Sequence, residues 1–137
     1  MKKGTSILFV NSHNQIILCL RDDKPTIQYP NCWDILGGNV EQDETPKQSI
    51  IREIKEELDV ELDPREVKLF NVYKLPDRKE YTFWKKADLD IENIQLHEGQ
   101  CLKWFSEDEV RNTPDEEIAF HFKPIILDFF NKTLPNK

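Results

Sequence analysis

The chain has 137 residues, of which 38% are hydrophobic and 33% charged, and its formal net charge is −7. This length predicts a single domain over residues 1–137, with one core built around a sheet. No apolar run approaches the roughly 20 residues of a membrane span, and the basic start leads into a stretch too short for a signal peptide, so we expect a cytoplasmic protein. The acidic balance argues against binding of long nucleic acids, because phosphate contacts need a basic surface.

The cysteines predict neither a disulfide framework nor a zinc site. Cys19, Cys32 and Cys101 are odd in number and widely separated, and they show no Cys-x-x-Cys or Cys/His spacing. We expect three reduced thiols.

The first third of the chain has the pattern of β-strands. Residues 5–10 and 16–20 form two β-type runs, and the polar residues 11–15 between them suit a hairpin or meander. A short third strand is expected over residues 33–36, ending at the glycine pair that follows.

The strongest pattern is a helix that begins at Pro46. Thr45 provides a hydroxyl cap, Pro46 takes the first helical position, and Gln48 stands three residues after the cap, which completes a capping box. Four aliphatic side chains then fall within one arc of roughly 100°, which predicts the buried face. They are Ile50, Ile51, Ile54 and Leu58.

Three acidic side chains gather on a second arc of this helix. Glu53, Glu56 and Glu57 stack there because residues three and four apart share one side, and Glu57 lies nearest the apolar face. Like charges at this spacing destabilise a helix by roughly 0.2–0.5 kcal/mol per pair, and acids in the last turn oppose its dipole. A solvated acidic face is one interpretation. Beside a buried face, however, the arrangement favours a site for a hard divalent cation, which takes oxygen ligands.

The second half of the chain predicts three more strands and a closing helix. The strands are expected over residues 67–73, 81–85 and 102–105, separated by a turn-rich and then an acidic segment. The last apolar segment, residues 120–130, predicts a helix with Pro124 in its first turn.

Residues 38–60 resemble the Nudix box, whose pattern is Gly-x5-Glu-x7-Arg-Glu-aliphatic-x-Glu-Glu-x-Gly-aliphatic. The aliphatic residues at 54 and 60 match, as do six Gly, Glu and Arg positions. The six are Gly38, Glu44, Arg52, Glu53, Glu56 and Glu57. The Trp-containing strand before the box, and the segment Trp104-Phe105-Ser106-x-x-Glu109 after it, are similar to MutT-like members. The resemblance implies an α/β/α sandwich around a mixed β-sheet.

Two positions depart from the family pattern. Asp59 replaces the last glycine of the box, where we expect the helix to end in a left-handed residue, a conformation that costs Asp about 1 kcal/mol. Replacement of Asp59 by Gly is therefore expected to raise the melting temperature and leave turnover unchanged. Leu36 stands where many members have proline, which affects the stiffness of the loop but not its chemistry.

The resemblance also implies a metal site. Glu53, Glu56 and Glu57 would hold one or more Mg²⁺ ions, for which Mn²⁺ can substitute, with the carbonyl of Gly38 as a further ligand. Ions of this kind bridge diphosphate oxygens and lower the pKa of a bound water that attacks phosphorus.

The identity of the catalytic base stays open between two glutamates. Glu53 is the first candidate, and Glu98 is the alternative because it resembles a loop acid that MutT-like proteins place near the metals. A solvent-exposed loop residue is the other interpretation of Glu98. Arg52 is expected to orient a glutamate, and Glu44 either ties the loop to the helix or acts as a ligand.

Substrate contacts are expected from Gly37 and Gly38 and from an aromatic ring. Aromatic residues in strands more often pack in the core than stack on a nucleobase. His121, a polar ring between two phenylalanines, is the ring we single out, and Trp33 and Trp104 are assigned to packing. The six rings able to stack on a base are Tyr73, Phe83, Trp84, Phe120, His121 and Phe122.

Three functions are compatible with the resemblance. The first is Mg²⁺-dependent hydrolysis of a nucleoside triphosphate, including oxidised ones such as 8-oxo-dGTP, and the MutT-like flanks favour it. The second is hydrolysis of ADP-ribose or a nucleotide sugar. The third is a regulator that only binds a nucleotide, against which the full set of box glutamates argues. The expected partner is a small nucleotide, bound by a monomer or a homodimer.

Overall fold

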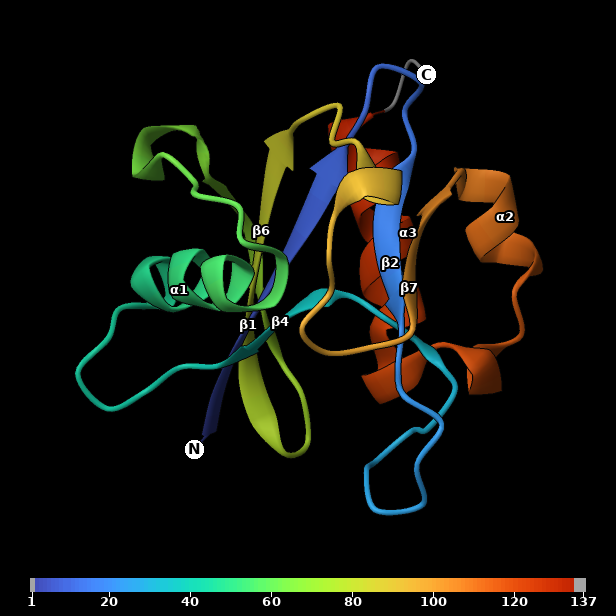
Figure 1. Cartoon of the computed structure of the whole chain (residues 1–137), viewed down its shortest axis with the longest axis horizontal. Coiled ribbons are helices and arrows are strands. Elements are labelled where there is room, and N and C mark those ends of the chain that lie inside the picture. Colours follow the sequence, from blue (N-terminus) through green and yellow to red (C-terminus); the bar gives the residue numbers. More distant parts are fainter. Residues whose placement is uncertain (1, 135–137) are drawn as a thin grey trace.

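The computed structural model describes residues 2–134, which form a mixed β-sheet with helices on both faces (Figure 1). The strands are β1 (Lys2–Val10), β2 (Ile16–Leu20), β3 (Trp33–Asp34), β4 (Leu36–Asn39), β5 (Lys68–Lys74), β6 (Arg78–Lys86) and β7 (Cys101–Phe105). The α-helices are α1 (Pro46–Leu58), α2 (Glu107–Asn112) and α3 (Phe122–Thr133). Short 3₁₀ turns are η1 (Pro64–Glu66), η2 (Ile91–Asn93), η3 (Asp115–Glu117) and η4 (Ala119–His121).

Strand β1 lies at the centre of the sheet. It pairs in parallel with β6 along its whole length and antiparallel with β2 and β4. The outer strands pair antiparallel, β5 with β6, and β3 and β7 with β2. The mixed sheet between helical layers confirms the predicted α/β/α class.

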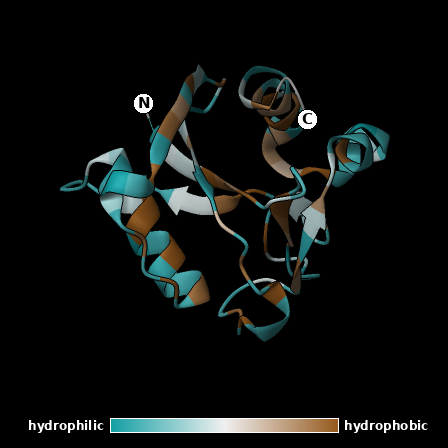
Figure 2. Cartoon of the chain, turned by 90° about the horizontal axis from the view of Figure 1, so that it is seen from above, coloured by the Kyte–Doolittle hydropathy of each residue, from teal (hydrophilic) through white to brown (hydrophobic). Residues whose placement is uncertain are grey.

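The sheet separates two hydrophobic clusters. Alternate residues of β1 point to opposite faces, so Ile7 and Phe9 pack with α1 while Leu8 and Val10 pack with α3. Figure 2 shows hydrophilic and hydrophobic bands alternating along the helices, as expected of helices that cover a sheet with one side only. Within residues 2–134, no helix has the length and hydropathy needed to span a bilayer.

Helix α1 begins and ends as its sequence predicts. The Thr45 side chain accepts a hydrogen bond from the Gln48 N–H, and the Gln48 side chain accepts one from the Thr45 N–H. Three of the four expected aliphatic residues are buried, and Ile51 is half-buried. Asp59 ends the helix with φ 59° and ψ 29°, which confirms the expected left-handed conformation.

The prediction of one strand over residues 33–36, ending at the glycines, was wrong. The strand breaks at Ile35, so that β3 pairs with β2 while β4 pairs with β1 and continues through both glycines to Asn39. A Cβ on Gly37 would lie 2.0 Å from the Thr5 carbonyl oxygen. Glycine therefore permits close strand pairing here instead of ending the strand.

The C-terminal part differs from expectation at two places. Helix α2 was not predicted, although Ser106 and Glu109 form a capping box at its start. Helix α3 begins at Phe122 and not at residue 120, because Phe120 and His121 adopt left-handed φ angles of 56° and 61°. Pro124 lies in the first turn of α3, as predicted.

Candidate active site

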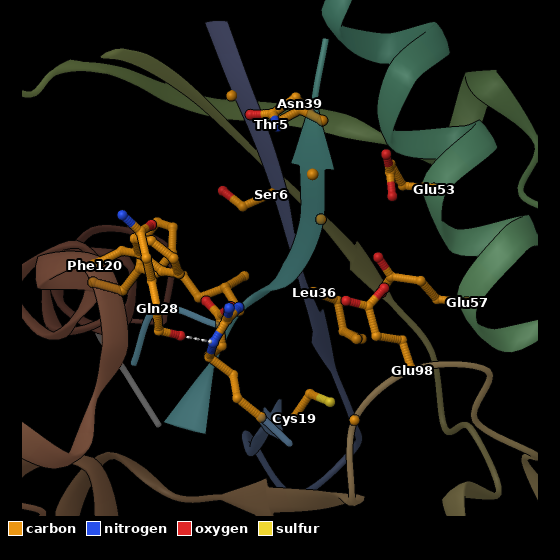
Figure 3. Close-up of a pocket in the computed structure, with 18 of the residues that line it drawn as sticks. Thr5, Ser6, Cys19, Gln28, Leu36, Asn39, Glu53, Glu57, Glu98 and Phe120 are labelled. Carbon is orange, nitrogen blue, oxygen red and sulfur yellow. Dashed lines mark hydrogen bonds and ion pairs between the residues drawn. The ribbon is translucent and has the colours of Figure 1, made fainter. Parts of the chain in front are cut away.

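A cavity of about 820 Å³ lies between α1, β4 and the loops at one end of the sheet. Figure 3 shows two chemically different ends. Glu53, Glu57 and Glu98 line one end, and Phe120 and Gln28 line the other. Thr5 and Ser6 lie between these two ends, and both glycines of β4 also line the cavity.

The acidic end brings together residues from two distant segments. Glu53 and Glu57 lie one turn apart on α1, and the carboxylate of Glu98 reaches Glu57 from the loop before β7 (Figure 3). Burial raises the pKa of the Glu57 carboxyl well above its usual value, and the neighbouring Glu53, Glu98 and Asp34 raise it further. A crowded, partly buried set of acids is a place where a cation would relieve repulsion.

Glu56 lies outside this set. Its side chain is 59% exposed and pairs with Arg52, and it is not part of the cavity wall. We expected all three glutamates of the box to face one space, but only Glu53 and Glu57 do so. The third carboxylate that lines the cavity is that of Glu98. Spacing alone placed Glu56 on the same helical side, but the guanidinium of Arg52 draws its carboxylate away.

Arg52 donates hydrogen bonds to three carboxylates beside the cavity. Its Nε donates to Glu44 Oε2 at 2.6 Å, and its Nη1 donates to Glu53 Oε1 at 3.1 Å and to Glu56 Oε2 at 3.2 Å. The hydrogen bonds from Arg52 lower the pKa of Glu44 to about 2. Glu44 also accepts from the Glu41 N–H, so it connects the loop before α1 to the helix.

Gly38 gives the Glu53 carboxylate room beside β4. A Cβ on Gly38 would lie 2.4 Å from Glu53 Cδ, closer than two carbon atoms can approach. The Glu53 carboxylate therefore rests against the backbone of β4 at Gly38.

The donor set at this end suits a hard cation. Within residues 2–134, no group of three or more His, Cys, Asp or Glu side chains is already arranged as a metal centre. The carboxylates of Glu53, Glu57 and Glu98 and the carbonyl of Gly38 nevertheless offer the oxygen donors that Mg²⁺ and Mn²⁺ prefer. Burial first, and the neighbouring carboxylates second, raise the pKa of Glu57, and a bound cation would offset both effects.

The other end of the cavity has an aromatic ring, Phe120, with two arginine side chains beside it. Phe120 contacts the Tyr29 ring at 4.6 Å between centroids, and the guanidinium carbons of Arg21 and Arg78 lie 5.0 and 5.5 Å from its centroid. His121 was predicted to bind substrate, but it is exposed and does not line the cavity. Residues 120 and 121 both adopt left-handed φ angles, and in this turn it is Phe120 that lines the cavity.

Two ion pairs flank Phe120. Arg21 Nη1 donates to Asp34 Oδ2 at 2.9 Å, and Arg78 Nε donates to Glu80 Oε1 at 2.8 Å. Burial raises the pKa of Asp34 to about 6, against the opposing effect of Arg21, and Asp34 Oδ1 finds no hydrogen-bond partner among the described residues. The sequence did not predict a role for these two ion pairs at the site. An acid inside the apolar run before the glycine pair was the available signal for Asp34.

The remaining aromatic residues pack as expected. Phe83 is buried, and Trp84 contacts Phe129 at 5.8 Å between ring centroids. The Tyr73 hydroxyl donates to Asp128 at 2.6 Å, and Trp33 packs edge-on against a neighbouring phenylalanine at 4.9 Å. These contacts confirm the assignment of most rings to packing.

Comparison with known proteins agrees with this geometry. Residues 2–127 match the family model of the NUDIX domain. The chain therefore belongs to the NUDIX family, which places it among hydrolases that act on phosphoanhydrides.

Two proteins of similar sequence have assigned activities. An ADP-ribose pyrophosphatase from Methanocaldococcus jannaschii is 31% identical over 88% of this chain and 68% of its own length. A CTP pyrophosphohydrolase from Escherichia coli is 32% identical over 60% of this chain and 61% of its own length.

Solved structures share the fold. A MutT/nudix family protein from Enterococcus faecalis superposes with a TM-score of 0.77 at 16% identity, over 98% of this chain and 62% of that one. A bifunctional NMN adenylyltransferase/ADP ribose pyrophosphatase from Francisella tularensis, complexed with AMP and a manganese ion, gives 0.70 at 21% identity, over 96% of this chain and 41% of that one.

Proposed function

We propose that the chain is a Mg²⁺-dependent pyrophosphohydrolase that converts a nucleoside triphosphate, including an oxidised one, and water into a nucleoside monophosphate and pyrophosphate. One observation carries the proposal: a single cavity has carboxylates at one end and an aromatic ring with two guanidinium groups beside it at the other. Such a cavity suits a ligand with a metal-bound polyphosphate at one end and a flat base at the other.

The residues of the acidic end have distinct roles in this proposal. Glu53, Glu57, Glu98 and the carbonyl of Gly38 would hold the ion, and Glu56 would join them only after leaving Arg52. A bound Mg²⁺ supplies charge neutralisation for the leaving phosphate and a more acidic water. Mn²⁺ can substitute, and the manganese ion in the Francisella protein of the same fold is consistent with that.

Proton transfer is assigned to Glu53. As water attacks, its oxygen forms a bond to phosphorus, the bond from that phosphorus to the bridging oxygen breaks, and a proton passes to the carboxylate. Arg52 holds Glu53 through the hydrogen bond to Oε1, which fixes the carboxylate for this step. Glu98, exposed on its loop, is the alternative base.

A second candidate function is hydrolysis of ADP-ribose or a nucleotide sugar. It is supported by the 31% identity to an ADP-ribose pyrophosphatase, whereas the CTP pyrophosphohydrolase supports the first candidate. Both reactions need the same acidic end and differ in the group attached to the second phosphate.

The test is a panel of nucleoside triphosphates, 8-oxo-dGTP, ADP-ribose and nucleotide sugars, each incubated with Mg²⁺ and analysed by chromatography. We expect a nucleoside triphosphate to give the monophosphate and pyrophosphate. ADP-ribose cleaved preferentially to AMP and ribose 5-phosphate would establish the second candidate instead. Binding of nucleotides without any product would contradict both and indicate a regulator.

A further inference from the structure

The segment that carries Glu98 is fastened at both ends. On one side, the His97 N–H donates to the Glu57 carbonyl at 3.1 Å. On the other, the Gln100 N–H donates to the Leu20 carbonyl at 2.8 Å, and its side chain donates to the Arg21 carbonyl at 2.7 Å. Glu98 lies between these two attachments and beside Glu57 in the cavity (Figure 3).

A side-chain contact reinforces the first attachment. His97 Nε2 lies 2.6 Å from Oδ2 of Asp59, the left-handed residue that ends α1. The main-chain bond to Glu57 uses one of the last helix carbonyls, which have no partner within the helix. His97 is therefore held to the end of α1 by both its backbone and its ring.

The position of Asp59 makes this contact unexpected. Glycine would adopt the left-handed conformation without strain, yet this chain has an acid there, close to three other carboxylates of the helix end. The side chains of Asp59 and His97 are 62% and 49% exposed, and a polar contact this exposed contributes little to stability even between charged groups. Stability alone therefore does not explain the acid at this position.

We propose that Asp59 and His97 form a brace that positions the Glu98 carboxylate beside Glu57. Asp59 is then a positioning residue, which acts on Glu98 through the adjacent His97. It follows Glu57 by two residues at the end of α1. This inference rests on the proposed function for its effect on turnover, but the brace itself can be measured without turnover. It also replaces the expectation that Asp59 is only a poor substitute for glycine.

The first experiment measures the brace directly. Amide hydrogen exchange of residues 97–100 is compared in the wild-type chain, Asp59→Gly and Asp59→Asn. We expect exchange to become about 10-fold faster in Asp59→Gly, while the melting temperature stays equal or rises. Asn tolerates the left-handed conformation and keeps a polar group that can bond His97, so Asp59→Asn should retain most of the protection. Unchanged exchange in Asp59→Gly would overturn the brace.

The second experiment measures the consequence for the reaction. With Mg²⁺ and the best substrate of the panel, Asp59→Gly should lower kcat about 10-fold or more with little change in KM, and Asp59→Asn should restore most of it. In a Glu98→Gln background, Asp59→Gly should cause no further loss, because its effect passes through Glu98.

Three results would contradict the proposal or the function beneath it, and they are distinguishable. Wild-type turnover in Asp59→Gly or in Glu98→Gln would overturn the positioning role. An equal loss from Asp59→Gly with and without Glu98 would show that Asp59 acts by another route. A wild-type chain that hydrolyses nothing in the panel would refute the proposed function, while the exchange measurement would still judge the brace.

Discussion

Replacement of Gly38 by Ala separates the geometry of the site from the stability of the fold. The added Cβ would lie 2.4 Å from Glu53 Cδ and 2.5 and 2.7 Å from its two carboxylate oxygens. All three contacts are with the end of a flexible side chain, and the backbone of Gly38 has no positive φ. Alanine can therefore be accommodated, but only if the Glu53 carboxylate moves away from β4.

The expected changes follow from this displacement. Alanine in a compatible conformation stabilises by about 0.4–1 kcal/mol through the unfolded chain, and moving Glu53 off its rotamer and off Arg52 costs about 1–2 kcal/mol. The free energy of unfolding should therefore change by about 1 kcal/mol or less. A displacement of about 1 Å at a catalytic group can reduce turnover on the order of 10²-fold, and we expect a loss of that size.

The neighbouring glycine supplies the matched control. A Cβ on Gly37 would lie 2.0 Å from the Thr5 carbonyl oxygen and 2.8 Å from Ser6 Cα, so backbone atoms of β1 would have to move. We expect Gly37→Ala to destabilise the fold by roughly 1–3 kcal/mol or more. Denaturant unfolding and kcat are measured for both variants. Wild-type kcat in a folded Gly38→Ala protein would refute the role of this close approach.

Three further predictions concern charge and metal. Turnover should require added Mg²⁺ or Mn²⁺, and undiminished activity in excess EDTA would contradict the mechanism. Burial raises the pKa of Asp34 from its usual 3.8 to about 6 in the folded chain, so this group stabilises the fold less as pH rises from about 4 through 6. Asp34→Asn should therefore make the loss of unfolding free energy between pH 4.5 and 7 about 2 kcal/mol smaller, and identical losses in both proteins, measured by urea unfolding, would refute this. Glu44→Gln should lower the free energy of unfolding at pH 7 by about 1–3 kcal/mol, because it weakens the hydrogen bonds between Glu44 and Arg52. An unchanged urea midpoint would contradict the role of Glu44 in connecting the loop to α1.

Local signals explain why α1 was predictable. Its start depends on Thr45, Pro46 and Gln48 within four residues, and its buried and acidic sides follow from helical spacing. The capping box of Ser106 and Glu109 is equally local and could have predicted α2. Elements whose determinants lie within one turn can be read from the sequence alone.

The far end of the cavity could not be predicted in this way. Arg21 and Tyr29 come from the loop between β2 and β3, and Arg78 and Phe120 come from two other segments, so only the fold brings the four together. The break at Ile35 likewise depends on which strand each half pairs with. Glu56 is a different case, because its contact with Arg52 joins residues four apart on one helix, a spacing that the sequence already contains.

The central claim is that the carboxylates of α1 hold a divalent cation for hydrolysis, and Glu57→Gln tests it most directly. The change keeps the shape and removes an acid whose ionisation is already disfavoured by burial and by its neighbours, so the metal-free variant should be as stable as the wild type or slightly more so. Glu61→Gln, which neutralises a side chain 84% exposed near the same helix end, is the control.

The deciding measurement is the melting temperature of the three proteins with and without Mg²⁺, beside kcat on the best substrate. A ligand at 100 times its Kd stabilises the folded state by about 2.7 kcal/mol. The wild type and Glu61→Gln should gain stability from Mg²⁺, whereas Glu57→Gln should gain much less and lose turnover by orders of magnitude. An equal Mg²⁺-induced shift and wild-type turnover in Glu57→Gln would contradict the assignment of this acidic end as the metal site.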